Sequence, residues 1–343
     1  KPPIEVPQGA IRLNTDSQKL EFFAQDRWYE MATDSPLLAE SGLGDVSLGA
    51  RGIFGTGTTP GTTDFIGFIN IASNGNEQDF GNAVTQNQGA SAGLSSRVRG
   101  LFAGGQNPVG NQIHFVTIAQ KGDSIDFGDL TRGTRFCEGA SNQTRGIIAG
   151  GMDSPNDARV NTSEFVTIAT TGNALDFGDL TVNRGQCRGV SNGTRAIFAC
   201  GQSPTKVNTI DFFMIGTLGN AMDFGDSTIA TDGQASGCNA IRGIYAGGAP
   251  AGDADQKVIE FITMATKGNA TNFGELSVQR SFAGGVSSPT RSVFAGGYTN
   301  PAATHSTTMD YVNNMTQGNA TDFGDQSVNR DQMGSFSNAH GGL

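Results

Sequence analysis

The sequence predicts an all-β fold built from six repeats. The first observation is a marker, Asp/Asn-Phe-Gly, whose phenylalanines lie at Phe80, Phe127, Phe177, Phe224, Phe273 and Phe323. Successive phenylalanines are 47 to 50 residues apart, as in 127 − 80 = 47. The second observation is an arginine before an apolar run, in the same register, at Arg51, Arg99, Arg145, Arg195, Arg242 and Arg291. A fixed period of this length is typical of repeat architectures, and it takes precedence over a domain count based on length.

Each repeat contains signals for four strands and no helix. In one repeat, "RAIFACG" (195–201) and "TIDFFMIGT" (209–217) are rich in residues that suit a pleated sheet. A Gly-Asn or Gly-Asp pair follows, such as Gly219-Asn220, and both residue types tolerate the positive φ of tight turns. A double glycine closes the second strand in four repeats and is interrupted at Gly55-Thr56 and Cys200-Gly201.

Sequence motifs at the two ends of the repeat region predict that the ends pair with each other. A Gly-x-Ser/Asn segment precedes the arginine at Gly93, Gly139, Gly189, Gly237 and Gly285. A sixth copy, "GSFSN" (334–338), has no arginine after it, whereas Arg51 has no such segment before it. We therefore expect residues 334–338 to form the first strand of the first unit. This pairing would close a ring and leave only short strand edges.

The repeats resemble kelch repeats in the order of these features, with phenylalanine where kelch blades usually carry tryptophan. The resemblance implies a six-bladed kelch-like β-propeller of four-stranded blades over residues 45–343, closed by the C-terminal strand.

Residues 1–44 do not share the repeat. The stretch "GAIRLNTDSQKLEFFAQDRWYEM" (9–31) alternates apolar and polar residues and holds the only tryptophan, Trp28, which predicts a small β-meander. It resembles the "G-x-I-R-x-N-T-x-x-x-K-L-E" hairpin of tailed-phage fibre and other virion proteins. The repeats also look like those of marine, cyanophage-type phage structural proteins. The two resemblances imply a virion surface protein, such as a fibre, spike or decoration protein, with other virion proteins and copies of itself as partners.

Charge and composition narrow the partners. A formal net charge of −10 and a pI of about 4.7 disfavour binding to nucleic acid or to anionic lipid. No apolar stretch approaches the length of a spanning helix, and no signal-peptide pattern opens the chain, so we expect a soluble protein without membrane insertion. Because the chain begins at Lys1 rather than Met, we expect either processing or residues before Lys1. Neutral polysaccharide or another protein remains as the partner.

The acid after each marker suggests a structural ion pair. These acids are Asp129, Asp179, Asp226, Glu275 and Asp325, one in each repeat except the first, which has Asn82 at this place. We expect one Arg/carboxylate pair in each blade, using Arg99, Arg145, Arg195, Arg242 and Arg291; Arg195 would pair with Asp179 or Asp226. The alternative is a cation bound by several carboxylates, but calcium loops space their ligands differently, so no metal is expected.

The remaining reactive or aromatic residues have structural explanations. The six marker phenylalanines are expected to pack between blades, although a stacking platform for sugar is the alternative. Cys137, Cys187, Cys200 and Cys238 lack metal-site spacing and are expected to be buried free thiols. The histidines share no motif. We therefore assign no catalytic residue, cofactor or metal.

This sequence does not contain the residue patterns of two enzyme classes with related folds. A galactose-oxidase-like copper site needs Tyr, His and a Cys cross-link, and sialidase boxes need tryptophan. The loops after the second strands vary, so they form the candidate ligand face, represented by Asn107, Asp153, Asn156, Lys206, Asp253, Tyr298 and Asn300. The first hypothesis is a non-enzymatic protein that recognises a host-surface ligand or glycan. The second is an adaptor that joins virion parts through the hairpin and one propeller face. A polysaccharide-active enzyme is the least favoured.

Overall fold

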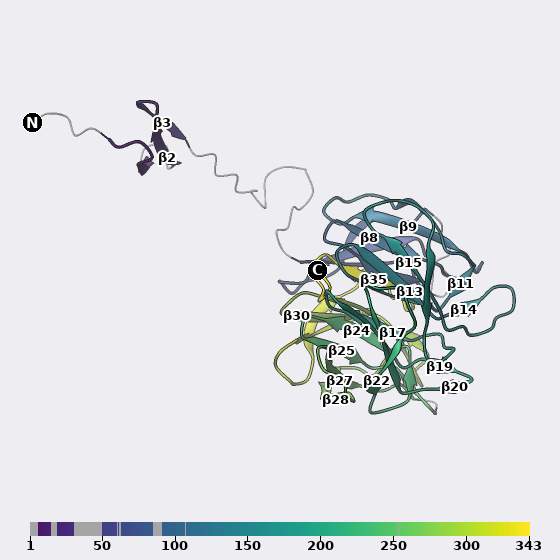
Figure 1. Cartoon of the computed structure of the whole chain (residues 1–343). Coiled ribbons are helices and arrows are strands. Elements are labelled where there is room, and N and C mark those ends of the chain that lie inside the picture. The colour runs from purple at the N-terminus through teal and green to yellow at the C-terminus, as the bar shows by residue number, and fades with distance from the viewer. Residues whose placement is uncertain are drawn as a thin grey trace, which may run out of the picture. The chain divides into compact units, whose positions relative to one another are not determined.

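The computed structural model describes residues 6–14, 19–30, 50–59, 61, 63–84, 91–106, 108–252 and 254–343. The chain divides into two compact units, residues 1–46 and 47–343. Among the described residues the regular elements are all β-strands, and Figure 1 accordingly shows arrows and loops without a coiled ribbon. The protein is therefore all-β.

The smaller unit contains a three-stranded antiparallel sheet. Its strands are β1 (Ile11–Asn14), β2 (Lys19–Ala24) and β3 (Arg27–Glu30), in that order. On one face, Arg12 forms an ion pair with Glu21 at 2.7 Å, and its guanidinium lies 4.1 Å from the ring centre of Trp28. The meander predicted from the alternating pattern is present in these residues.

The larger unit contains, in its described part, six four-stranded antiparallel sheets (Figure 1). Sheet 1 comprises β35 (Gly334–Ser337), β4 (Arg51–Gly55), β5 (Phe65–Asn70) and β6 (Gln78–Asn82). Sheet 2 comprises β7 (Ala92–Ser95), β8 (Arg99–Ala103), β9 (Gln112–Thr117) and β10 (Ile125–Asp129). Sheet 3 comprises β12 (Glu138–Ser141), β13 (Arg145–Ala149), β15 (Thr162–Thr167) and β16 (Leu175–Asp179).

The other three sheets repeat this order. Sheet 4 comprises β17 (Arg188–Ser191), β18 (Arg195–Ala199), β21 (Thr209–Met214) and β22 (Met222–Asp226). Sheet 5 comprises β24 (Ala235–Cys238), β25 (Arg242–Ala246), β27 (Val258–Thr263) and β28 (Thr271–Glu275). Sheet 6 comprises β29 (Gly284–Ser287), β30 (Arg291–Ala295), β33 (Thr308–Asn313) and β34 (Thr321–Asp325).

Sheet 1 joins the two ends of the larger unit. Strand β35 pairs antiparallel with β4, with Gly334 opposite Gly55 and Ser337 opposite Gly52. This is the pairing that the unmatched "GSFSN" segment predicts. The first strand of each sheet also contacts the first strand of the next, in the order β35, β7, β12, β17, β24, β29, and β29 contacts β35.

The apolar cores lie between consecutive sheets. Each of six clusters combines residues of two sheets; one contains Phe127 of sheet 2 with Ile148 and Val166 of sheet 3. The marker phenylalanines are 2 to 3% exposed and belong to these clusters. Full burial of one such side chain contributes about 1.5 to 3 kcal/mol, so these rings stabilise the packing of one sheet on the next.

The marker glycine allows the next sheet to approach. A Cβ on Gly178 would overlap the carbonyl oxygen of Gly219, which belongs to the turn of sheet 4. That turn donates from the Gly219 and Ala221 N–H groups to the carbonyls of Phe177 and Asp179, and the Asn220 side chain accepts from Asp179 N–H. The phrase Gly-Asn followed by Asp-Phe-Gly therefore joins neighbouring sheets along their outer strands.

Two details of the predicted register are wrong. In the first repeat, Thr56-Gly57 rather than Gly55-Thr56 occupies the position of the double glycine. Thr56 and Cys200, which replace the first glycine, adopt the left-handed backbone, with φ of 58° and 59°. In sheet 5, Ser236 takes the position expected for Gly237, because Ser236 pairs with Tyr245 as Gly189 pairs with Phe198. Neither difference changes the strand order.

Candidate functional site

The repeated arginines have a different partner from the one predicted. Arg195 donates to the carbonyl oxygen of Met264 in sheet 5 at 2.7 Å, and its guanidinium lies 4.9 Å from the ring centre of Phe212 in its own sheet. The other repeats follow the same plan: Arg51 donates to Ile118, Arg99 to Ala169, Arg145 to Ile215, Arg242 to Asn314 and Arg291 to Ala72. Each arginine thus joins two sheets through a carbonyl and an aromatic ring.

The strand register explains why the predicted Arg/carboxylate pairs do not form. Arg195 lies opposite Met214, at the end of β21, whereas Asp226 lies opposite Thr209, at its start. In the described residues the marker acids instead use their backbone, because the N–H groups of Asp129, Asp179, Asp226, Glu275 and Asp325 donate to asparagine side chains of the next sheet. These five residues are half-buried or exposed.

Three ion pairs that the sequence reasoning missed lie fully buried between sheets. Arg184 pairs with Asp211 at 3.0 Å, Arg280 with Asp310 at 3.0 Å, and Arg330 with Glu77, all with 0% side-chain exposure. Hydroxyls add to the sites, since Thr181 donates to Asp211 at 2.6 Å. In all three pairs the arginine lies five residues after the acid that follows the marker. For Arg184 and Arg280 the acidic partner directly precedes the aromatic residue of the next third strand, as Asp211 precedes Phe212, whereas Glu77 does not lie on a third strand.

Sheets 3 and 5 keep the acid without this arginine. Glu164 accepts from the N–H of Thr131 at 3.0 Å, and Glu260 accepts from Thr228 N–H at 3.0 Å and from Gln234 Nε2 at 3.2 Å. In sheet 2 the same position is His114, which is 2% exposed and whose pKa is lowered by burial. These sites join sheets and offer no accessible reactive group.

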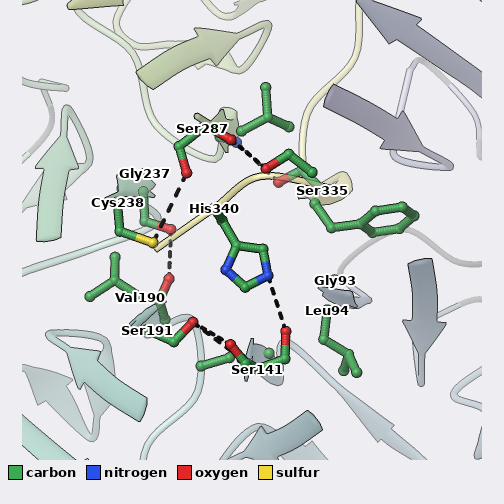
Figure 2. Close-up of a pocket in the computed structure, with 18 of the residues that line it drawn as sticks. Gly93, Leu94, Ser141, Val190, Ser191, Gly237, Cys238, Ser287, Ser335 and His340 are labelled. Carbon is green, nitrogen blue, oxygen red and sulfur yellow. Dashed lines mark hydrogen bonds between the residues drawn. The ribbon is translucent and has the colours of Figure 1, made fainter. Parts of the chain in front are cut away.

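The first strands enclose a small pocket, the inner-strand pocket, shown in Figure 2. A row of serine hydroxyls links the strands: Ser141 donates to the carbonyl of Ser95 at 2.8 Å, Ser191 to that of Ser141 at 2.7 Å, and Ser95 to that of Ser337 at 2.7 Å. Glycines two residues earlier permit this spacing, since a Cβ on Gly139 would overlap the Gly93 carbonyl. In sheet 5 the serine position is Cys238, whose Sγ lies 4.0 Å from Ser287 Oγ.

His340 is one of the residues that line this pocket. Figure 2 shows its imidazole beside Ser141, and its Nε2 is 3.4 Å from Ser141 Oγ and 3.3 Å from the Ser95 carbonyl oxygen. Gly341 and Gly342 press against carbonyl oxygens of Ser191 and Ser141, where a Cβ would overlap them. Burial lowers the pKa of His340 to about 4, so the imidazole is neutral at pH 7.

An ion pair occupies the other side of the inner-strand pocket. Arg188 Nη1 is 2.6 Å from Glu138 Oε2, and Arg188 Nε donates to the Gln234 carbonyl. Burial raises the pKa of Glu138, while Arg188 opposes that rise. The equivalent positions in the other four sheets are small: Ala92, Ala235, Gly284 and Gly334.

The cysteines are buried and poorly nucleophilic. Burial raises the thiol pKa of Cys137 to about 12, of Cys187 to about 11 and of Cys200 to about 12. All four cysteines are free thiols. Since the thiolate is the nucleophile, these side chains act as small fillers of the core.

The candidate loops are tied to one another across neighbouring sheets. Lys206 donates to the carbonyls of Ala249 and Pro250, and its Nζ is 3.2 Å from Asp232. Asn300 N–H donates to Asp255 at 2.7 Å, and its carbonyl accepts from Asp255 N–H. Short two-stranded sheets stiffen the loops: β11 (Thr134–Arg135) with β14 (Met152–Asp153), β19 (Gln202–Ser203) with β20 (Thr205–Lys206), β23 (Thr231–Asp232) with β26 (Ala249–Pro250), and β31 (Tyr298–Thr299) with β32 (Thr304–His305).

The candidate residues on this face lie in different surroundings. Asp153 accepts from Ala158 N–H, Asn156 is exposed, and the Tyr298 ring meets the His305 ring edge to face at 5.4 Å. Asn107 and Asp253 lie outside the described residues. A groove of about 660 Å³ runs beside β31 and β32, with Thr299, Thr304 and Ser306 among its lining.

The described part of the chain contains no group of three or more His, Cys, Asp and Glu side chains placed to hold a metal ion. No helix in it is long and apolar enough to cross a membrane.

Comparison with known proteins gives no assignment. No protein-family model matches this chain, and no curated protein matches it.

Proposed function

We propose that the six sheets are the blades of a closed kelch-like β-propeller. The interface between sheets 6 and 1 supports this, because it repeats the contacts of the other interfaces. Gly75 N–H donates to the Phe323 carbonyl at 2.9 Å, and Asp325 N–H donates to Asn76 Oδ1 at 3.0 Å, as in the Asp179–Asn220 contact. Arg291 also reaches from sheet 6 to Ala72 and Asn74 of sheet 1.

The propeller serves as the recognition part of a non-enzymatic virion surface protein, a fibre, spike or decoration protein that binds a host-surface ligand or glycan. The observation that carries this proposal is the loop face, where loops of neighbouring sheets are fixed to one another by Lys206 and by the Asp255–Asn300 contacts. A polar surface fixed before binding loses little entropy when a ligand docks. The groove lined by threonine and serine hydroxyls suits an uncharged hydroxyl-rich partner.

A second candidate function, that of an adaptor between virion components, is favoured by the smaller unit. Ile11, Leu13 and Phe22 are 64%, 60% and 37% exposed. Ile11 pairs with Phe22, so the two lie on one face of the sheet, and Leu13 shares that face because it is two residues along the same strand. Exposed apolar residues grouped on one face are typical of a surface that docks on another protein.

Binding of the full chain to an array of bacterial surface glycans tests the proposal. We expect retention of an uncharged glycan, with loss of binding in a variant whose groove carries Thr299→Ala and Thr304→Ala or whose loop face carries Lys206→Ala. If no glycan is retained and the Ile11→Ser/Leu13→Ser variant fails to assemble into particles, the adaptor function replaces recognition. Release of sugar products from host polysaccharide would contradict the non-enzymatic proposal.

A further inference from the structure

A second pocket lies at the loop end of the first strands. This pocket, the mouth pocket, has a volume of about 20 Å³, enough for one group the size of a water molecule or a methyl. Its lining includes Ser91, Phe136, Gln186, Phe282 and Met333. It shares Glu138 and Arg188 with the inner-strand pocket, so the ion pair forms its floor.

The rim of the mouth pocket is built from residues in the left-handed backbone. Phe136, Gln186, Phe282 and Gln332 have φ between 54° and 61°, which is uncommon for such large side chains. Backbone hydrogen bonds from sheet to sheet hold them there: Gln186 N–H donates to the Phe136 carbonyl, and Gln332 N–H donates to the Phe282 carbonyl, both at 2.9 Å. Strained residues kept by their surroundings are frequent at binding sites.

Two polar atoms of this pocket have no hydrogen-bond partner in the described structure. They are Ser91 Oγ, on a residue that is 3% exposed, and Gln186 Oε1. Gln332 differs, since its Oε1 accepts from Gln106 Nε2 at 2.9 Å. A buried polar atom without a partner costs free energy, so a hydroxyl and an amide oxygen left unpaired beside an open pocket point to a ligand that pairs with them.

The charge of the floor selects an uncharged ligand. Arg188 is already neutralised by Glu138 at 2.6 Å and also donates to the Gln234 carbonyl. A carboxylate or phosphate entering the pocket would have to displace this buried pair or meet the carboxylate of Glu138. Removing the partner of a buried charge is strongly unfavourable.

We propose that the mouth pocket binds the acetamido group of an uncharged N-acetylated sugar. The methyl group fits the small volume between the aromatic rings, the amide N–H donates to Gln186 Oε1, and the acetyl oxygen accepts from Ser91 Oγ. Phe136 and Phe282 receive the C–H face of the sugar ring at the rim. If the hydroxymethyl group of a sugar entered the pocket in place of the acetamido group, its hydroxyl would contact the apolar wall. This inference rests on the proposed function and names the ligand class that the propeller recognises.

Titration calorimetry of the full chain tests the proposal with two probes, methyl N-acetyl-β-glucosaminide and methyl β-glucoside. We expect the acetamido sugar to bind at least 10-fold more tightly than the glucoside. Ser91→Ala is expected to weaken binding of the acetamido sugar at least 5-fold. It should not lower the midpoint of thermal unfolding, because Ser91 Oγ has no hydrogen-bond partner in the protein without ligand. Gln186→Asn keeps a residue that tolerates positive φ, shortens the side chain, and should weaken binding similarly.

Ser73→Ala, on the exposed turn between β5 and β6, is the matched control and should bind the acetamido sugar as the unchanged protein does. Equal affinity for the two sugars, or unchanged binding by Ser91→Ala and Gln186→Asn, would overturn the inference. A lower midpoint for Ser91→Ala would also overturn it, since the hydroxyl would then already be bonded, for instance to a fixed water. If Thr304→Ala abolishes binding of an array glycan and Ser91→Ala does not, the proposed recognition function stands but the ligand does not bind in the mouth pocket. If no glycan binds, the proposed function itself is contradicted.

Discussion

Two interfaces of the larger unit contain the same buried ion pair but build it differently. Between sheets 5 and 6, Arg280 meets Asp310, which lies on the third strand of sheet 6. Between sheets 6 and 1, Arg330 meets Glu77, which precedes β6. The strand position equivalent to Asp310 is Gly67 in sheet 1, and a Cβ there would overlap the carboxylate of Glu77.

The difference shows that each of these interfaces requires a carboxylate at one point in space rather than at one position in the sequence. Arg330 and Arg280 are both fully buried, and an isolated guanidinium in an apolar interior is strongly unfavourable. Gly67 leaves space at the strand position that Asp310 occupies in sheet 6, and Glu77 places its carboxylate in that space. Two differences in sequence thus take the place of one acid on the strand. The interface that joins the chain ends is thus equivalent to an interface between repeats that are neighbours in sequence.

The largest expected effect comes from removing either acid. Glu77→Ala and Asp310→Ala should each lower the free energy of unfolding by about 3 to 5 kcal/mol, because each leaves a buried arginine without a partner. Denaturation in guanidinium chloride at pH 7 measures both. A much smaller loss for Glu77→Ala than for Asp310→Ala would show that the two interfaces are not equivalent.

Moving the acid should restore the pair. Glu77→Ala removes the atoms that a side chain at position 67 would meet, so adding Gly67→Asp places a carboxylate where Asp310 lies in sheet 6. We expect the double variant to regain at least half of the lost stability. Gly67→Asp alone should destabilise the protein through overlap with Glu77, and a double variant no more stable than Glu77→Ala would contradict the spatial explanation.

The second prediction concerns two groups that flank the joining strand β35 and titrate in opposite directions. Burial raises the pKa of Asp331 to about 7, above its usual 3.8, so the folded protein takes up a proton that the unfolded chain does not, and stability rises as pH falls from above 7 toward 4. Burial lowers the pKa of His340 to about 4 from 6.5, so its contribution is present above pH 6.5 and is lost as pH falls toward 4.

Single variants should separate these opposing contributions, each about 2 kcal/mol. When the pH falls from 7.5 to 5, the Asp331→Asn variant should lose more stability than the unchanged protein. The His340→Gln variant should lose less stability than the unchanged protein, or gain stability. His305 Nε2 lies 3.7 Å from Asp331 Oδ1 and burial lowers its pKa, so the Asp331→Asn profile reports on this pair, whereas His340→Gln leaves the pair unchanged. Parallel pH profiles for the three proteins, from denaturant unfolding, would contradict both assignments.

The third prediction separates the observed role of the repeated arginines from the predicted one. Arg195→Met should cost about 1 to 2 kcal/mol, since it removes a charged hydrogen bond to Met264 and a contact with Phe212. Asp179→Asn should change stability by less than about 0.5 kcal/mol, because Asp179 joins the next sheet through its backbone N–H. Equal losses in thermal or denaturant unfolding would restore the ion-pair hypothesis.

The sequence predicts the repeated elements of this molecule better than the contacts between them. The period, the phenylalanines and the unmatched "GSFSN" segment follow from patterns within one chain segment, and β35 pairs with β4 as expected. The partner of Arg195 depends on which end of a strand each side chain occupies, which the spacing of motifs does not define. Arg184 and Asp211 could have been found by aligning consecutive repeats, because both stand at fixed offsets from the marker.

Other features have no signal in a single sequence. Glu77 leaves the strand position of its counterparts, so an alignment of repeats gives only Gly67 there. The left-handed backbone of Phe136 and Phe282 arises from hydrogen bonds between sheets, and phenylalanine has no intrinsic preference for it. The mouth pocket therefore depends on contacts between residues that are distant in the sequence, such as Ser91, Gln186 and Phe282.

The smallest expected effect concerns the one sheet whose serine position is a cysteine. Ser141, Ser191 and Ser95 donate to neighbouring carbonyls at 2.7 to 2.8 Å, but Ser287 Oγ meets Cys238 Sγ at 4.0 Å. Cys238→Ser should give a hydroxyl placed to donate as its counterparts do, and should raise the free energy of unfolding by about 0.5 to 1 kcal/mol. Ser191→Cys is the matched reverse change and should lower it by a similar amount. Loss of stability in both variants would mean that packing of the thiol, rather than the row of hydroxyl bonds, determines the fit of the first strands at this interface.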